Sequence, residues 1–519
     1  MSQENSIFKK WVPQKMVVPI FMITLFPHMM ILSLFNMNST FTASFLDLEV
    51  DDLQFLFSLA YAMIVCGLFI HVRFFHFFNV RNYLLTMTML NIIVLFSMTL
   101  TTNKELVLLL RFIQGPLTIL EGAILLPINM ANIKNENSKL ITYSFLYGLI
   151  LTGDKITTSI AKFAIQNYNH NMMVYTIMIL HVVALTIYVF FFNQNRMFPK
   201  KPLYQLNLGG IFLMMISLIS GAFLLIYGKK YNWFESSYIV LAFASTLIFS
   251  GLFIIHQKTT KRPLFNFEVL QSERVIIGII LFFVFYILRS GMSNIYQVMA
   301  TVWHWHWEYV LEIQYFNVIG SITGIIVSFF LVKNKIDFRI IFSVGFTLLA
   351  FSMLWFSYLF YPETQLSAIT PPLVLQGISQ GMLFTPLVLY IIGSVHPNFS
   401  GSASHAGVAA RFWTTTIGFS VMQNAVLYLT TKHQFSMVKN LDKSSPIFQE
   451  QWTNLSNKNN LIHLPNDADL LSAGVLKSKL FNQALLVSNI EIFRVLFILG
   501  IVTAFIILMY RPIKNRLFA

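Results

Sequence analysis

The chain has 519 residues, of which 56% are hydrophobic and only 11% are charged. Because soluble proteins carry about 25% charged residues to cover their surface, this composition excludes a row of soluble domains and predicts an integral membrane protein. The net charge of +14 would suit nucleic acid or an anionic membrane surface, and the positions of the charges decide between the two.

Read in chain order, the sequence contains fourteen apolar runs long enough to cross a bilayer as helices, which takes about 20 residues each. Unbroken runs such as 276–288 exclude the alternating segments of a membrane β-barrel. The first run follows three lysines and is too long for a cleavable signal sequence. The runs lie at about 16–36, 53–72, 82–101, 106–130, 140–164, 172–192, 207–228, 236–256, 275–295, 311–332, 339–361, 370–394, 406–430 and 489–510.

Positive charge is distributed unevenly between the loops. Most Lys and Arg residues fall in loops that would share a side with the N-terminus, whereas the opposite short loops hold Lys104, Lys229 and Lys230. Since Lys and Arg accumulate on the cytoplasmic side, both termini are predicted to be cytoplasmic in a multi-pass protein of the inner (cytoplasmic) membrane. The charge therefore marks membrane topology, and we expect no binding to nucleic acid.

The longest polar segment, at about 431–488, falls on the outer side and favours one or two surface helices. The sequence lacks the motifs GxxxxGKS/T, HExxH and GxSxG, so we expect no ATP-binding domain, no enzyme and no cofactor. The single cysteine, Cys66, excludes a disulfide within the chain. His304 and His306 lack a nearby Cys or Asp, which favours a place in the interfacial aromatic belt over a metal site.

Two segments of the chain resemble each other. Residues 121–127 (EGAILLP) in the fourth run match 380–386 (QGMLFTP) in the twelfth, and each is preceded by a Gln-Gly pair, at 114–115 and 376–377. The shared position favours an internal repeat over the general abundance of Gly and Pro in membrane helices. Repeated halves are typical of secondary transporters, and this pairing leaves two additional runs between two six-helix halves.

These motifs resemble the major facilitator superfamily, in particular its branch of drug:proton antiporters with fourteen spans. Residues 109–115 (LLRFIQG), followed by Glu121, Gly122 and Pro127, are similar to the fourth-helix motif of that branch. The resemblance implies an all-α membrane fold of two six-helix bundles plus two extra spans. The implied domains are 1–195 for the first bundle, 196–273 for the extra spans, and 274–519 for the second bundle with its long outer loop.

The same resemblance implies an exporter of lipophilic compounds, cationic ones included, that works in exchange for protons by alternating access. In double-membrane bacteria, members of this branch work with a periplasmic adaptor and an outer-membrane channel, so these are implied partners beside substrate, protons and lipid. The chain departs from the family pattern in two places: His76 replaces an acid between spans two and three, and Asp154 replaces a proline in span five. These departures leave open an uptake or anion carrier of the same fold.

Ionisable side chains are costly inside a bilayer, at roughly 2.5–3.5 kcal/mol each on insertion scales. Asp154 and Glu121 are the two acids well inside the runs, and with Arg111 and Lys155 they would form a charged network facing the central cavity. We expect Asp154 to carry the proton and Glu121 to bind protons or cationic substrate, with a structural ion pair or hydrogen bond as the alternative. By resemblance, Arg111 assists proton transfer.

The predicted substrate-binding residues are Glu121, Arg289, Gln376 and Gln380. Arg289 in span nine would attract an anionic group, whereas we expect Arg411 to extend its side chain to the cytoplasmic end of span thirteen. His28 is a lone histidine in span one, which favours a hydrogen-bonded core residue over a coupling group.

Overall fold

The structure is a computed structural model that describes residues 7–32, 34, 46–133, 135–167, 171–393, 395–396, 399–439, 446–460 and 465–510. Within these residues helices account for most of the chain, and the β-contact found there is an isolated bridge between Phe8 and Phe192. The predicted all-α class is confirmed. In chain order the α-helices are α1 (Val17–Leu32), α3 (Val50–Phe77), α4 (Val80–Thr99), α5 (Lys104–Asn132), α6 (Ser138–Asn167), α7 (Asn171–Phe191), α8 (Leu208–Tyr227), α9 (Ser237–Thr259), α10 (Glu273–Thr301), α11 (Trp307–Lys333), α12 (Phe338–Ser357), α13 (Leu366–Gly393), α14 (Ser400–Lys439), α15 (Pro446–Asn460) and α16 (Pro465–Met509).

Among the described residues, twelve helices are long and apolar enough to cross a membrane. The two predicted runs outside this set, 140–164 and 406–430, lie within α6 and α14, which have 30 and 40 residues and are helical over these whole stretches. About 20 helical residues suffice for a crossing. The chain is therefore a multi-pass membrane protein.

Local sequence signals begin and interrupt these helices. α5 begins where the Asn103 side chain accepts hydrogen bonds from the backbone N–H groups of Glu105 and Leu106, which satisfies donors that the first turn leaves open. Pro127 lies inside α5 and Pro386 inside α13, at equivalent positions of the sequence repeat. Membrane helices tolerate such prolines because neighbouring helices and polar side chains satisfy the freed backbone groups.

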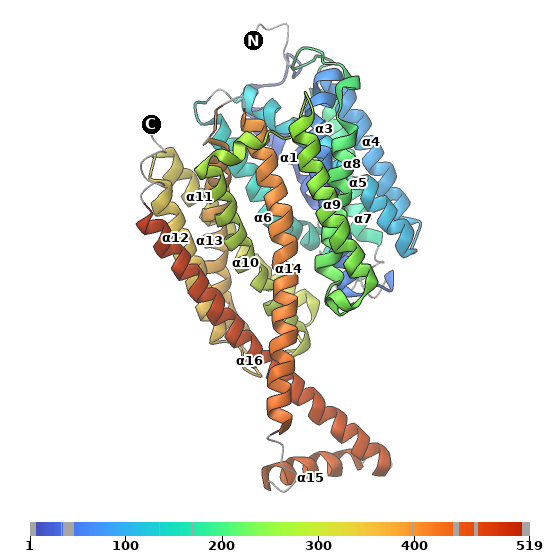
Figure 1. The fold of residues 1–519 in the computed structure, drawn as a ribbon, viewed down its shortest axis with the longest axis vertical. Coiled ribbons are helices and arrows are strands. Elements are labelled where there is room, and N and C mark those ends of the chain that lie inside the picture. Colours follow the sequence, from blue (N-terminus) through green and yellow to red (C-terminus); the bar gives the residue numbers. More distant parts are fainter. Residues whose placement is uncertain are drawn as a thin grey trace.

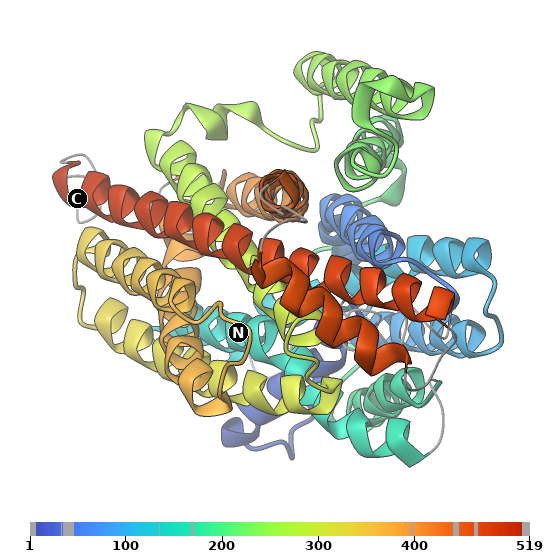
Figure 2. The same cartoon turned by 90° about the horizontal axis from the view of Figure 1, so that it is seen from below.

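The helices form two groups with a helix pair beside them (Figures 1 and 2). α1 and α3–α7 pack against one another, and α10–α14 with α16 form the second group. The groups meet where α6 packs against α11 and α13, and where α3 packs against α14. The pair α8 and α9 lies alongside, with α8 in contact with α3 and α14. The domain boundaries near residues 195 and 273 stay a prediction.

The sequence repeat reappears in the packing of two helix pairs. α5 lies so close to α3 that a Cβ on Gly115 would come within 2.6 Å of the Ala60 carbonyl oxygen. α13 lies equally close to α11, where a Cβ on Gly377 would come within 2.3 Å of the Asn317 carbonyl oxygen. Gly115 and Gly377 are the glycines of the two Gln-Gly pairs. In both groups, therefore, the repeated glycine permits the close approach of two helices.

α14 and α16 are longer than a membrane crossing requires. They have 40 and 45 residues, or about 60 and 68 Å at 1.5 Å per residue, against a hydrocarbon core of about 30 Å. Both continue beyond the other helices at the lower end of Figure 1, where α15 packs against α16. The segment expected as an outer loop at 431–488 is therefore largely the continuation of these two helices, with α15 between them. We refer to this part of α14, α15 and α16 as the protrusion.

Candidate functional site

Glu121 lies in the middle of α5 and is fully buried within the first group of helices. Two side chains from α4 hold its carboxylate: the Thr88 hydroxyl donates to Oε1, and the Asn91 amide donates to Oε2 over 2.7 Å. Thr88 and Asn91 are three residues apart, which places them on the same face of α4. A buried carboxylate needs such donors, because burying an oxygen away from water without a replacement hydrogen bond destabilises the folded state.

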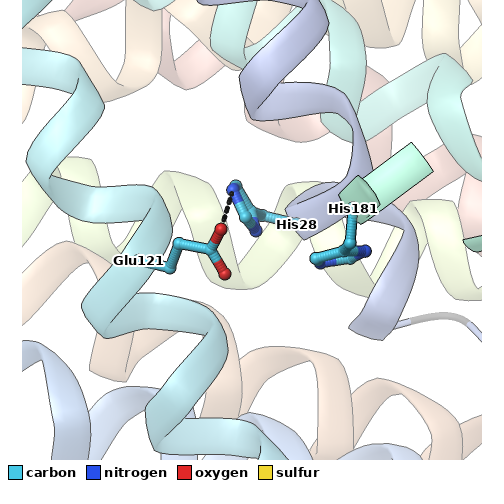
Figure 3. A group of neighbouring side chains, drawn as sticks. All are labelled: His28, Glu121 and His181. Atoms are coloured by element: carbon cyan, nitrogen blue, oxygen red, sulfur yellow. Dashed lines mark ion pairs between the residues drawn. The ribbon is translucent and has the colours of Figure 1, made fainter. Parts of the chain in front are cut away.

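Two histidines complete the surroundings of Glu121 (Figure 3). His28 Nε2 from α1 lies 3.3 Å from Glu121 Oε1. His181 from α7 lies edge-on to His28, with ring centroids 5.3 Å apart. His181 Nδ1 lies 2.9 Å from the Ile177 carbonyl oxygen, so in the neutral ring Nδ1 carries the hydrogen and Nε2 keeps a free lone pair. Among the described residues, that buried Nε2 has no hydrogen-bond partner. His28 is thus a buried core residue that lies beside an acid.

His28, Glu121 and His181 also have the arrangement of a possible metal site. One ligand atom of each lies within 4.8 Å of the other two, and two imidazoles with one carboxylate form a ligand set that Zn²⁺ accepts. The bonds from His181 to a carbonyl and from α4 to Glu121 are of the kind that orient metal ligands. Sequence reasoning expected no metal site and did not consider these three residues together, which lie far apart in the chain.

Arg111 is buried nearer the beginning of α5. Its guanidinium group donates to the Ile31 carbonyl oxygen over 2.8 Å and to the Gln114 side chain over 2.7 Å. Ten residues, or about 15 Å of helix, separate Arg111 from Glu121. The structure therefore places Arg111 at the contact between α5 and the end of α1, away from the Glu121 carboxylate.

Asp154 belongs to α6, and its side chain lies outside the described residues. Lys155, the next residue, is half-buried, and its ammonium nitrogen lies 3.5 Å from the Leu151 carbonyl oxygen one turn earlier. The proton-carrying role of Asp154 stays a prediction.

Gln376 and Gln380 lie on the face of α13 that packs against α11. The Asn317 amide of α11 donates to the Gln376 side-chain oxygen, and the Gln380 amide donates to Asn317 Oδ1 over 3.0 Å and to Gln376 Oε1 over 2.9 Å. All three side chains are buried. In an apolar medium such amides pair with one another across helices, so in this arrangement they join α11 to α13.

A second polar site lies where the two groups of helices meet. The guanidinium carbon of Arg411 on α14 lies 5.5 Å from the ring centroid of Tyr147 on α6 and 5.9 Å from that of Phe384 on α13. The same carbon of Arg289 on α10 lies 5.8 Å from the ring centroid of Tyr286. Arg411 also lines a cavity of about 10 Å³, the size of one water molecule. It does not extend to the end of its helix as expected, because the aromatic rings offer the cation a nearer partner.

Sequence reasoning missed His181, Thr88 and Asn91. Each is a single polar residue in an apolar run, and only the packing of α4, α5 and α7 brings them to Glu121. A weak signal was present, because Thr88 and Asn91 share one helix face and polar residues facing the interior of a bundle often mark function.

No family model matches the chain. Among curated relatives, the multidrug export protein EmrB of Escherichia coli (strain K12) is 22% identical over 55% of this chain and 54% of its own. The probable multidrug resistance protein EmrY of the same strain is 22% identical over 47% and 48%. The fatty acid resistance protein FarB of Neisseria gonorrhoeae is 21% identical over 58% of each chain. The chain thus spans about half the length of the curated relatives it matches.

Solved structures match over nearly the whole chain. A POT family transporter in complex with a thioalcohol conjugated peptide is 14% identical, with 97% of this chain and 99% of that chain covered and a TM-score of 0.62. XylE, a proton:xylose symporter of the major facilitator superfamily, is 13% identical over 96% of both chains, with a TM-score of 0.55. The human organic anion transporter MFSD10 is 11% identical over 94% and 100%, with a TM-score of 0.54. The chain is therefore a multi-pass membrane protein with the major facilitator fold, and the resemblance to multidrug export proteins predicted from its sequence is confirmed.

Proposed function

We propose that the chain is a secondary transporter that exports lipophilic small molecules in exchange for protons. The observation that carries this proposal is the buried Glu121 carboxylate, which has donors from α4 on both oxygens and His28 Nε2 at 3.3 Å. An acid inside the membrane is costly and is retained where it does work, such as taking up and releasing a proton. The names of EmrB and EmrY, multidrug export and multidrug resistance, support export.

A proton on Glu121 rearranges the hydrogen bonds around it. The ionised carboxylate only accepts hydrogen bonds, here from Thr88 and Asn91. A protonated Glu121 donates one hydrogen itself, and His28 Nε2 is a neighbouring atom that can accept it. Protonation of Glu121 therefore changes the contact between α1 and α5. This change shifts the equilibrium between the inward-open and outward-open states of the two helix groups.

Asp154 is the second proposed proton carrier, with Arg111 assisting proton transfer. The support for both roles is the sequence resemblance, together with the position of α6 in the same helix group as Glu121. By the same resemblance we propose an inner membrane location with cytoplasmic termini, and a periplasmic adaptor and an outer-membrane channel as partners.

Lipophilic anions belong among the proposed substrates beside cations. FarB is named a fatty acid resistance protein and MFSD10 an organic anion transporter, and Arg289 and Arg411 supply positive charge at the junction of the helix groups. An uptake carrier is the alternative direction, favoured by Asp154 in the place of the antiporter proline.

The test is transport in proteoliposomes that contain equal amounts of purified protein. In proteoliposomes that contain the wild-type protein, a pH gradient should drive a fluorescent lipophilic dye across the membrane in the direction opposite to the proton flow. Glu121→Gln and Asp154→Asn should each lower this rate at least tenfold, because neither amide can carry a proton. Glu105→Gln, on the exposed first turn of the same helix as Glu121, is the matched control and should keep the rate.

Three outcomes would count against the proposal in different ways. Absence of proton-driven transport by the wild-type protein would reject the proposal that the chain is an exporter. Dye movement in the direction of the proton flow would favour the uptake carrier. A wild-type rate in Glu121→Gln would show that this carboxylate is structural, and the same result in Asp154→Asn would remove the second carrier.

A further inference from the structure

Among the described residues, the junction of the two helix groups carries positive charge that no acid pairs with. Neither Arg411 nor Arg289 takes part in the ion pairs found among the described residues. α13 and α14 contain no Asp or Glu at all, and α10 contains none after Glu273. The buried Arg411 Nε also has no hydrogen-bond acceptor among the described residues. Asp154 of α6 lies two turns after Tyr147, and its side chain is outside the described residues. Charges inside a membrane normally pair with an opposite charge, so the described part of this junction lacks an anion.

Aromatic rings lie beside both guanidinium groups. Tyr147 and Phe384 pack edge to face with centroids 4.8 Å apart, and the Phe384 centroid lies 6.2 Å from that of Tyr286. Ring faces attract a guanidinium group, but they carry no net charge and offset its desolvation only in part. The rings also present a continuous apolar surface beside Arg411, on which a hydrocarbon or aromatic body can pack.

The junction lies near the middle of the membrane. Arg411 is eleven residues after the beginning of α14, Tyr147 is nine after the beginning of α6, and Phe384 is nine before the end of α13. At 1.5 Å per residue these positions are about 14–17 Å from the ends of their helices on one side, a depth that corresponds to about half of a 30 Å hydrocarbon core. Secondary transporters bind substrate at this depth, between their two halves.

We propose that this junction binds amphipathic monoanions, and we call the set Arg411, Arg289, Tyr147, Tyr286 and Phe384 the Arg411 site. A carboxylate pairs with a guanidinium group through two parallel hydrogen bonds, while the apolar body of the ligand packs on the rings. A lipophilic cation at the same place would meet two like charges. The proposal rests on the transport function above, because it takes this junction as the substrate path.

The surroundings of Glu121 agree with this division of roles. Its oxygens are engaged by Thr88 and Asn91 of its own helix group, so it does not neutralise the Arg411 site. The cavity beside Arg411 has room for about one water molecule. An anion with an apolar body therefore enters only when the two helix groups move apart, as alternating access requires.

The experiment measures binding to the full-length protein in nanodiscs of zwitterionic lipid, without a pH gradient. The probes are a fluorescent twelve-carbon carboxylate, its methyl ester, and the trimethylammonium of the same chain, each corrected for binding to empty nanodiscs. The carboxylate should bind at least tenfold more tightly than the ester or the cation. Arg411→Gln should weaken carboxylate binding at least tenfold and leave ester binding within about twofold.

Further variants separate charge from folding. Arg411→Lys keeps the charge and should restore part of the carboxylate affinity, and Arg289→Gln should weaken it by removing the second cation. Arg262→Gln removes one positive charge from an exposed loop and should change nothing. Equal affinity for the three probes, or an equal loss for carboxylate and ester in Arg411→Gln, would overturn the Arg411 site.

The binding result is distinguishable from the transport result. Carboxylate binding that depends on Arg411, in a protein without proton-driven transport, would keep the Arg411 site and reject the exporter. Proton-driven export of the dye, in a protein that binds all three probes equally, would keep the exporter and reject the Arg411 site.

Discussion

The hydrogen bond from Asn91 to Glu121 connects α4 to α5 through one neutral donor and one acid. Removing only the donor leaves a buried carboxylate oxygen without a partner, which costs about 1–3 kcal/mol. Replacing both partners by apolar side chains of similar shape is nearly neutral, because no polar atom then lacks a bond. The losses of stability from replacing Asn91 and from replacing Glu121 therefore should not add.

We expect Asn91→Leu to lower the thermal unfolding temperature of the purified protein. The double variant Asn91→Leu with Glu121→Leu should recover at least half of that loss. Asn82→Leu, on the exposed surface of the same helix, is the matched control and should change little. Glu121→Leu alone completes the set, and if the double variant lost as much as the two single variants together, the coupling between Asn91 and Glu121 would be absent.

At the scale of single residues, the sequence predicts acids better than it predicts their partners. Glu121 was identifiable because an acid in an apolar run is rare and costly. His28 and His181 were not, because their approach to Glu121 depends on how α1 and α7 pack against α5. Arg411 was misplaced for the same reason: the rings of Tyr147 and Phe384 come from other helices.

At the scale of elements, the contact between α11 and α13 depends on glycine. A Cβ on Gly324 would come within 2.1 Å of the Ile378 carbonyl oxygen, and a Cβ on Gly320 within 2.3 Å of the Val374 carbonyl oxygen. These neighbours are backbone atoms, which cannot rotate away as a flexible side chain can. The helices would have to separate. The hydrogen bonds between the side-chain amides of Asn317, Gln376 and Gln380 would then lengthen.

Gly324→Ala should therefore lower the thermal unfolding temperature strongly or reduce the yield of folded protein. Gly251→Ala in α9 is the matched control, because a Cβ there meets nothing within 4 Å, and alanine favours a helix over glycine by about 1 kcal/mol. Thermal unfolding in the same detergent measures both. Equal effects of the two substitutions would contradict the role of close packing at Gly324.

The existence of the membrane helices was predictable and the length of two of them was not. Each apolar run predicts a helix, because backbone N–H and C=O groups in lipid must form hydrogen bonds within the chain. The outer parts of α14 and α16 lie beyond that constraint, and their polar residues resemble those of a loop. The pattern of residues 431–488 therefore indicated surface structure without showing that both spans continue into it.

At the scale of the whole molecule, polar contacts connect the two helix groups near one end. Lys162 Nζ on α6 lies 3.1 Å from Glu312 Oε1 on α11. The Gln423 amide on α14 donates to Gln54 over 2.8 Å and to Asp51 over 3.1 Å, both on α3. α3 and α11 begin at this end and α6 finishes there. Opening the protein at this face requires these contacts to break.

A bifunctional methanethiosulfonate cross-link between Lys162→Cys and Glu312→Cys should therefore lower proton-driven transport at least tenfold, and a reductant should restore it. The natural cysteine, Cys66, is buried, so the reagent modifies the introduced pair selectively. The control pair Ser456→Cys and Asp469→Cys joins α15 to α16 within the protrusion, where the native side chains lie 2.9 Å apart. Transport that continues after cross-linking of the 162–312 pair would show that this face does not need to open.

The continuity of α14 gives the protein a lever arm. α14 is one unbroken helix from Ser400 to Lys439 that contains Arg411, and it continues into the protrusion (Figure 1). The distance between Arg411 and Lys439 is about 42 Å along the axis, so a tilt of about 5° around Arg411 moves the far end by about 4 Å. A small tilt within the membrane thereby becomes a larger displacement outside it, and a molecule bound at the end of the protrusion would move with it.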